Sequence, residues 1–323
     1  MIINTGSRTD IPAFFHTWFY NRIREGYVLV RNPYQPQQVT RYLLDPAVVD
    51  VLSFCSKNPA PMLPRIHELD TFRQLWHVTI TPYGRDIEPY VPTKTEVLKT
   101  FRALSEVVGK GAIVWRYDPV FLSEKYSLSF HKKAFRSMAA FLRGTTEQCV
   151  VSFIDLYEKT KRNFPQARTV SSAQQEELID AFDSIAAENG MQIHLCCESS
   201  ALTAGHPHTD AQGCFSQAVI EKAAGIHLSA PSHSPARKAC ACLLGGDIGA
   251  YNTCLHGCRY CYANYDRAIV EAHAAAHDPE SPYLIGHAMA GDIIKDADQK
   301  SWIDRQMNLF DFLQSTQSVF PFR

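Results

Sequence analysis

The chain has 323 residues, of which 46% are hydrophobic and 20% are charged, and this balance excludes a mainly disordered protein. The 32 basic and 33 acidic residues give a formal net charge of -1, which excludes binding to nucleic acid through bulk charge but leaves a local basic groove open. No apolar run is long enough to span a bilayer, and the first residues lack the core of a signal peptide. We therefore expect a cytoplasmic protein without a membrane partner.

Six short apolar runs predict β-strands, and four amphipathic stretches with residues typical of helix starts and stops predict helices. The strand runs are residues 1–5, 48–54, 76–81, 112–117, 150–155 and 191–196. The helical stretches are residues 12–25, 94–111, 129–144 and 171–190. The strand runs are mostly apolar, as expected of strands that are covered on both faces.

The alternation of strands and helices predicts parallel strands joined by right-handed crossovers. Six such units favour an α/β fold, a full or partial (β/α) barrel, over two separate domains. We divide the chain into a barrel core over residues 1–200 and a second segment over residues 201–323. This second segment is cysteine-rich, is expected to bind the cluster and to end in a helical stretch, and is expected to pack as one unit with the barrel.

Polar or charged residues follow each predicted strand. Ligands of a β/α barrel bind at the carboxyl ends of its strands, so these residues predict a pocket around one mouth. The candidate catalytic residues are Arg8, Lys57, Arg116, Asp118, Asp155 and Glu198. The basic members are expected to hold anionic groups of a substrate, and the acidic members to orient polar hydrogens. Taken singly, each residue is equally well explained as a helix cap or a loop ion pair.

Eight of the ten cysteines lie between Cys196 and Cys261, in about a fifth of the chain. A reducing compartment disfavours disulfides, so metal ligation or catalysis is the better interpretation of this concentration. Cys55 and Cys149 lie outside it, next to apolar runs, and are interpreted as thiols packed in the core.

The most specific motif is TCLHGCRYCYAN, which has C-x3-C-x2-C spacing at Cys254, Cys258 and Cys261. An aromatic residue, Tyr260, precedes the last cysteine. Structural zinc sites usually have four ligands in C-x2-C pairs. Three closely spaced thiolates instead suit three irons of a [4Fe-4S] cluster, with the fourth iron open to an exogenous ligand. The alternative is a zinc site or a purely structural knot.

A second set of cysteines precedes this triplet with irregular spacing. It consists of Cys196, Cys214, Cys240 and Cys242. Four thiolates close a coordination sphere, which suits an auxiliary iron–sulfur cluster or a structural zinc, and the absence of a metal is a third interpretation. Cys197 is adjacent to Cys196 and is interpreted as a packing residue.

Several segments of the chain resemble the family catalogued as domain of unknown function 1848. They include RTDIPAFF, SKNPAP, TITPYGRDIEP, VWRYDPVFLSEKY, SFIDLY and DIGAYNTCLHGCRYCYAN, and the resemblance extends over nearly the whole chain. The triplet with its aromatic residue is also similar to the signature of radical S-adenosylmethionine proteins. In that superfamily the open iron chelates S-adenosylmethionine, and an electron from the cluster cleaves the cofactor to a 5′-deoxyadenosyl radical.

This second resemblance implies S-adenosylmethionine as cofactor and an electron donor such as flavodoxin or ferredoxin as partner. It implies cofactor contacts for Tyr260 in the triplet loop and for Gly246 and Asp247 in the segment GGDIG, the nearest match to a Gly-Gly-Glu segment. The triplet of the superfamily normally follows the first barrel strand. Its position in the last third of this chain requires a permuted arrangement or a C-terminal loop that closes over the barrel.

The expected function is a radical S-adenosylmethionine enzyme that acts on a small-molecule or nucleotide substrate. One alternative is an iron–sulfur redox protein that does not use this cofactor, and another is a zinc-stabilised binding module. The segment YCYAN is also similar to that of spore photoproduct lyases, so nucleic acid remains an open substrate class.

Overall fold

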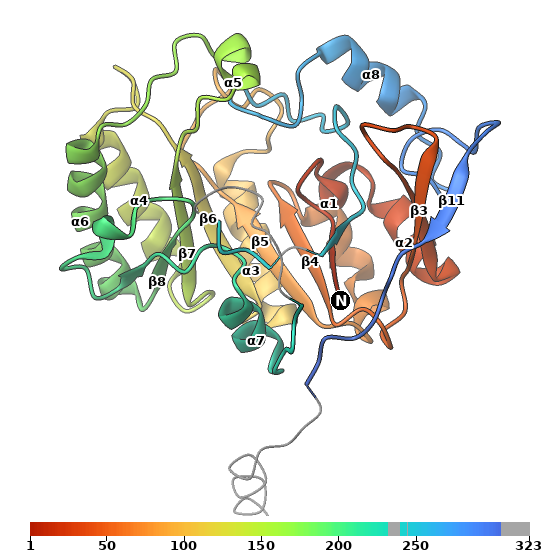
Figure 1. Ribbon diagram of the computed structural model, residues 1–323. Helices are drawn as coiled ribbons and strands as arrows, with labels where there is room; N and C mark the ends of the chain where they lie inside the picture. The colour runs from red at the N-terminus through yellow and green to blue at the C-terminus, as the bar shows by residue number, and fades with distance from the viewer. Residues whose placement is uncertain (232–239, 244, 305–323) are drawn as a thin grey trace, which may run out of the picture.

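The computed structural model describes residues 1–231, 240–243 and 245–304, and these residues form one large parallel sheet with helices beside it (Figure 1). Within them, the sheet has eight strands in the order β10-β1-β4-β5-β6-β7-β8-β9. Every pair of neighbouring strands in it is parallel. The predicted α/β class is therefore confirmed.

All six predicted strands are present, with ends that differ by a few residues from the predicted ranges. They are β1 (Ile2–Asn4), β4 (Val51–Ser56), β5 (Gln74–Thr79), β6 (Ile113–Val120), β7 (Gln148–Phe153) and β8 (Gln192–Leu195). The two edge strands, β9 (Thr209–Asp210) and β10 (Gly246–Asp247), are two residues long each, which is too short for an apolar pattern.

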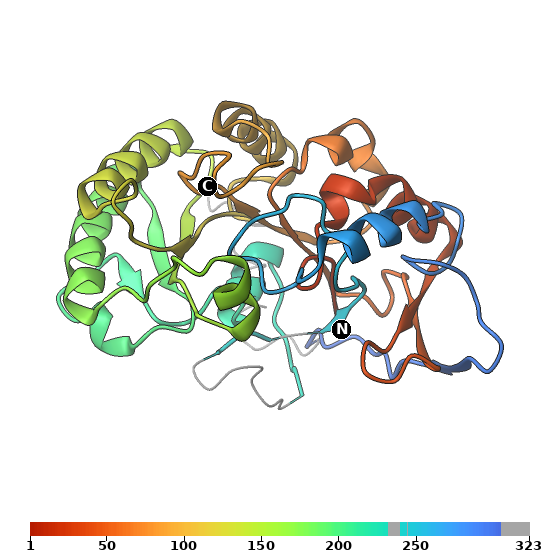
Figure 2. The same ribbon diagram turned by 90° about the horizontal axis from the view of Figure 1, so that it is seen from above.

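The sheet has two edges in the described part of the chain, so it is an open sheet there and the full barrel is not formed. β9 and β10 are these edges, and each pairs on one side only. Figure 2 shows the sheet from above, curved and with α4 (Leu128–Leu142) and α6 (Ser172–Asn189) on its outside. A partial barrel remains compatible with this arrangement.

The four predicted helical stretches are helical in the structure. They are α1 (Ile11–Phe14) with α2 (His16–Glu25), α3 (Lys94–Val108), α4 and α6. Capping boxes at Thr93 and Ser171 satisfy free backbone N–H groups at the starts of α3 and α6. The first stretch is broken at Phe15, whose backbone leaves the helical region between α1 and α2.

Other elements connect or flank this framework. They are the 3-10 helices η1 (Ala60–Leu69) and η2 (Ser200–Thr203), the helices α5 (Glu158–Asn163), α7 (Gln217–Ala224) and α8 (Arg267–Ala275), and the strands β2 (Tyr27–Arg31), β3 (Gln38–Leu43) and β11 (Ile293–Asp296). The last three strands form a small separate sheet in the order β11-β3-β2. The predicted helical stretch at the end of the chain falls largely on residues 305–323, outside the described residues.

The outer face of the sheet carries the main apolar core, because strand side chains alternate between two faces and helices cover this one. Trp115 of β6 stacks on Phe135 of α4, with ring centroids 4.7 Å apart, and Phe135 stacks on Phe182 of α6 at 4.1 Å. Cys149 of β7 is fully buried in the same core, as its apolar surroundings predict.

The inner face of the sheet is apolar at the amino ends of the strands and polar toward their carboxyl ends. A buried row of Ile2, Val51, Leu75, Val114 and Val150 packs with Val219 and Ile220 of α7. Two positions further along four of these strands, on the same face, lie Ser53, His77, Arg116 and Ser152. This change of polarity positions a site at the carboxyl ends of the strands.

None of the helices that the structure describes has both the length and the apolar composition needed to cross a membrane.

Candidate functional site

The triplet loop directly follows the edge strand β10 and lies across the carboxyl ends of β1 and β5. His256 Nε2 is 2.9 Å from Oδ2 of Asp10, which follows β1. On the side of β5, the backbone N–H of Arg259 donates to the carbonyl of Ile87 at 3.0 Å, and that of Tyr90 donates to the carbonyl of His256 at 3.2 Å. The loop is thus held at the end of the sheet where strand-end ligand sites form.

A buried carboxylate, Glu88, links the triplet loop to the strand ends. Lys57, after β4, donates to Glu88 Oε1 at 2.8 Å, and Lys94 and the Tyr260 hydroxyl also bond to this carboxylate. Thr81 donates to it at 2.6 Å. Burial alone would raise the pKa of Glu88, but the ammonium groups of Lys57 and Lys94 lower it to about 2, so the group is ionised.

Of the three triplet thiols, Cys258 lies near this charged group, since its pKa is affected by Lys57 and Glu88. The three triplet cysteines are half-buried, and their sulfur atoms do not all lie within 4.8 Å of one another. Burial raises the pKa of Cys258 to about 12, while nearby Lys57 acts in the opposite direction. Lys57 also lowers the pKa of Cys261, against a larger effect of burial. A metal that binds such thiols displaces their protons, and Lys57 offsets the negative charge that results.

Arg116 and Asp118 pair with each other on the inner face at the carboxyl end of β6. Arg116 also donates to the Cys55 thiol at 3.4 Å, so the half-buried Cys55 is part of the site and is not the simple core residue expected from the sequence. The electrostatic effect of Asp118 on Lys57 places this pair near the triplet side of the mouth. The structure thus brings together three of the six predicted catalytic residues, Lys57, Arg116 and Asp118.

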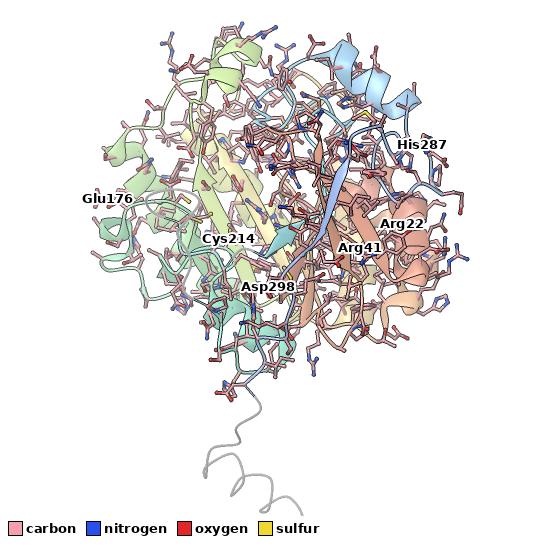
Figure 3. The ribbon with its side chains drawn as sticks, turned by 45° about the vertical axis from the view of Figure 1, so that its right-hand side comes forward. Arg22, Arg41, Glu176, Cys214, His287 and Asp298 are labelled. Carbon is pink, nitrogen blue, oxygen red and sulfur yellow. The ribbon has the colours of Figure 1, made fainter. Side chains whose placement is uncertain are left out.

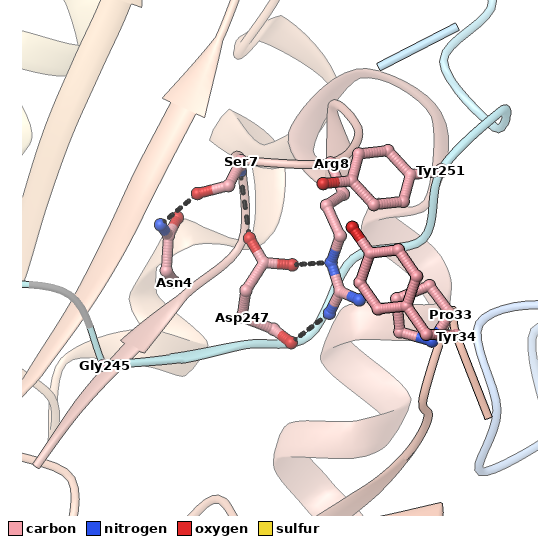
Figure 4. Close-up of a pocket in the computed structure, with 8 residues that line it drawn as sticks. All are labelled: Asn4, Ser7, Arg8, Pro33, Tyr34, Gly245, Asp247 and Tyr251. Carbon is pink, nitrogen blue, oxygen red and sulfur yellow. Dashed lines mark hydrogen bonds and ion pairs between the residues drawn. The ribbon is translucent and has the colours of Figure 1, made fainter. Parts of the chain in front are cut away.

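Arg8 lies at the β1–β10 edge, in a different part of the mouth. Its guanidinium donates to the side chain of Asp247 at 2.7 Å and to the Asp247 carbonyl at 2.6 Å (Figure 4). The Asp247 carboxylate also accepts the backbone N–H of Ser7 at 3.1 Å. These residues line an open pocket of about 270 Å³ with Tyr34 and Tyr251.

Asp155 and Glu198 lie at the ends of β7 and β8. Asp155 is exposed and accepts a hydrogen bond from Tyr157 at 3.1 Å. Glu198 accepts the backbone N–H of Phe153 at 2.7 Å and the hydroxyl of Ser152 at 3.2 Å. Burial raises the pKa of Glu198 to about 7, and Asp155 contributes in the same direction, so the two carboxyl groups are close.

Three members of the second cysteine set meet in the interior. The Sγ atoms of Cys196 and Cys242 are each 3.3 Å from that of Cys214, and all three atoms lie within 4.8 Å of one another. Figure 3 shows Cys214 beside the strands of the sheet. This buried group, which we call the cysteine triad, could hold a metal ion or a cluster. Cys240, the fourth predicted member, lies outside it and is half-buried.

Arg116 lies close to the triad. Its charge acts on Cys196 and Cys214 of the triad and on Cys55. Tyr262 of the triplet loop experiences the charges of Cys261 and Arg116. Arg116 thus acts on the triad and on Tyr262, the residue after the triplet cysteine Cys261.

Several residues of the site were not predicted. Glu88 belongs to the loop between β5 and α3, which has no periodicity that would indicate which side chains turn inward, and Lys94 is the first residue of α3. His77, whose Nε2 lies 2.8 Å from the carbonyl of Cys214, was hidden inside a predicted strand. The signal for His77 is a titratable residue inside a predicted strand, which indicates a polar position on one face of the sheet.

Comparison with known proteins gives one match. A family model described as "Domain of unknown function (DUF1848)" matches residues 2–263, which include the eight-stranded sheet of the described residues and both cysteine groups. The comparisons with curated proteins and with solved structures gave no match. The family description names no activity and no link to radical S-adenosylmethionine proteins. Since the match covers most of the chain, the protein belongs to the DUF1848 family.

Proposed function

We propose that the protein is an iron–sulfur enzyme of radical S-adenosylmethionine type, with a [4Fe-4S] cluster on Cys254, Cys258 and Cys261. The observation that carries this proposal is the position of the triplet loop, which lies over the carboxyl ends of the parallel strands beside Lys57 and Glu88. A cluster bound there faces the part of the sheet where a substrate would bind.

The residues present fit such a cluster. Thiolates are the usual ligands of iron–sulfur clusters, and three of them leave one iron without a protein ligand. The triplet thiols are spread more widely than the ligands of a single tetrahedral ion, which in the case of zinc would lie about 3.8 Å apart for Zn–S bonds of about 2.3 Å. Lys57 provides a positive charge beside the two thiols Cys258 and Cys261.

The strand order supports the relation to the radical superfamily. β10 is late in the sequence but occupies the edge position next to β1, and the triplet begins a few residues after it. Read across the sheet from this edge, β10 takes the place of a first strand. This position of the triplet beside β1 supports the proposal of a permuted arrangement.

When bound, the cluster would supply the electron that cleaves S-adenosylmethionine and starts radical chemistry. The chain's own residues bind and orient the substrate. Arg116 and Lys57 attract anionic groups, and Glu88 fixes the Lys57 ammonium in place. Asp118 holds the guanidinium of Arg116, and Glu198 offers a carboxyl group to polar hydrogens. This arrangement favours a small polar or nucleotide substrate with at least one negative charge.

One observation favours an iron–sulfur redox protein without S-adenosylmethionine as a second candidate. A Cβ atom at Gly245 would lie 1.8 Å from the backbone oxygen of Ile2, and one at Gly246 would lie 2.5 Å from the Tyr42 ring. Close packing alone thus explains both glycines. The Asp247 carboxylate already accepts hydrogen bonds from Arg8 and Ser7, so it is not free to bind the amino group of S-adenosylmethionine.

Iron analysis tests the cluster. Protein purified without oxygen should contain about four irons at this site, and replacement of the three triplet cysteines by Ala should remove them. The matched control is Cys149→Ala, which removes a buried thiol from the opposite face of the sheet and should retain the iron. Equal iron contents in the triplet variant and the wild type would contradict the assignment.

Incubation of the reduced protein with S-adenosylmethionine separates the two candidates. We expect 5′-deoxyadenosine and methionine to form with the wild type and with Cys149→Ala, and not with the triplet variant. A wild type that contains the cluster, is reduced and leaves S-adenosylmethionine intact would favour the redox protein. A protein that contains zinc and no iron would favour the binding module.

A further inference from the structure

The cysteine triad is a different kind of site from the triplet loop. Its three sulfurs come from the end of β8, from the loop before α7 and from the segment before β10. All three residues are buried, with Cys196 3%, Cys214 9% and Cys242 5% exposed. We propose that the triad binds a single zinc ion, separate from the cluster on the triplet and independent of it.

The spacing of the sulfurs decides between one ion and a cluster. Tetrahedral zinc with Zn–S bonds of about 2.3 Å places its sulfur ligands about 3.8 Å apart. The separations of 3.3 Å between the sulfur of Cys214 and those of Cys196 and Cys242 are close to this value. In a cubane each thiolate binds a different iron, so its ligands surround a larger body and lie further apart. The triad is too compact for that arrangement.

The backbone holds the three donors in place. The N–H of Leu243 donates to the carbonyl of Phe215 at 2.8 Å, which joins the segments of Cys242 and Cys214. The N–H of Cys196 donates to the carbonyl of Val151 at 3.0 Å, which fixes the third donor to the sheet. These backbone bonds fix the positions of the three donor residues relative to one another.

The surroundings suit a buried thiolate-bound ion. Phe215, Val219, Ile220 and Leu228 enclose the triad on the side of α7. The guanidinium of Arg116 acts on Cys196 and Cys214 from the side of the sheet. Three thiolates and one divalent ion carry one net negative charge, and a nearby fixed cation compensates that charge in a buried place. The triad supplies three of the four ligands of a tetrahedral zinc ion.

Metal analysis of the whole protein tests this proposal. Protein purified without oxygen in zinc-containing medium should contain about one zinc per chain. Cys214→Ser should lose this zinc and keep the iron of the triplet, whereas the triplet variant should lose iron and keep zinc. Cys149→Ala should keep both metals. Iron that leaves with Cys214→Ser, or a wild type without zinc, would overturn the proposal whether or not the triplet binds a cluster.

A second measurement does not depend on the folding of a variant. Titration of the wild type with a mercurial thiol reagent, in the presence of a chromogenic zinc chelator, should release about one zinc per chain. Cobalt(II) bound in place of the zinc should give the intense visible bands of a tetrahedral thiolate site. Release of no zinc, or cobalt bands typical of octahedral oxygen ligands, would contradict a zinc–thiolate site.

Discussion

Glu88 shows how much of this site depends on one buried side chain. It is 2% exposed and accepts hydrogen bonds from two lysines, a threonine and a tyrosine that come from separate parts of the chain. Its carboxylate neutralises Lys57, which faces the triplet thiols. The residue thus connects the strand-end charges to the loop above them.

Glu88→Gln should destabilise the protein strongly, because it leaves Lys57 and Lys94 buried with a neutral partner. Removal of one member of a buried ion pair costs about 3–5 kcal/mol. We expect a loss of about 3 kcal/mol in the free energy of unfolding, measured by urea denaturation. Asp296→Asn is the matched control, because Asp296 is 67% exposed in its pair with Arg41 and should contribute little to stability. Equal effects of the two substitutions would contradict this role of Glu88.

For single residues, the sequence predicts which side chains carry the chemistry better than it predicts which side chains contact one another. The spacing of the triplet cysteines is unusual enough to be found by inspection, and Arg116 and Asp118 are charges at the end of an apolar run. Glu88 could not be selected in the same way, since acidic residues in loops are common. Only the fold determines which of them turns inward.

His131 of α4 illustrates how an element is fixed to the sheet. Its Nε2–H donates to the carbonyl of Phe121 at 2.9 Å, so Nδ1 accepts the hydroxyl of Tyr117 at 2.8 Å. The neutral ring satisfies both bonds, and burial lowers its pKa from 6.5 to about 4. A proton on Nδ1 would remove the bond from Tyr117.

The stability of the protein should therefore fall at acid pH through His131. A group whose pKa is lowered by folding contributes stability above its unfolded pKa and loses it as the pH falls through the folded pKa. Between about pH 6.5 and pH 4 the loss amounts to about 3 kcal/mol. His131→Gln keeps a donor and an acceptor without a titrating group. Urea denaturation at several pH values should show a smaller acid loss for this variant, and identical pH profiles would contradict the expectation.

The predictable elements are those with a local signal. The helices α3 and α6 begin at Thr93 and Ser171 because the side chains of these residues cap them, and both residues are visible in the sequence. The break between α1 and α2 could not be predicted, because the residue at the break is Phe15 and not a proline or a glycine. The strands β9 and β10 exist because neighbouring strands pair with them, which a sequence pattern of two residues cannot show.

At the scale of the whole molecule, the order of the strands matters more than their number. The sequence predicts a parallel sheet, yet it does not predict that a segment from the last third of the chain pairs beside β1. That pairing is long-range and depends on close contact between Gly245 and the backbone of Ile2. This pairing brings the triplet loop to the carboxyl ends of the parallel strands.

Gly245→Ala should separate β10 from β1. The added Cβ would lie 1.8 Å from the Ile2 carbonyl oxygen, and backbone cannot move as a flexible side chain does. We expect a loss of about 1–3 kcal/mol in unfolding free energy and a lower iron content after purification without oxygen. Gly111→Ala is the control, because no atom lies within 4 Å of its added Cβ, and it should change stability by less than about 0.5 kcal/mol. Full iron content in Gly245→Ala would show that the triplet does not depend on this edge.

The same pairing sets the order in which the site is made. Translation adds about 5–20 residues per second from the amino end, so segments early in the sequence are free to fold first. In the described residues, seven strands of the large sheet precede β10 in the sequence, and the triplet follows β10. The ribosome therefore completes the strand-end residues from Arg8 to Glu198 before it makes Cys254. Iron and sulfide delivered to the triplet meet thiols that are among the last parts of the site to be synthesised.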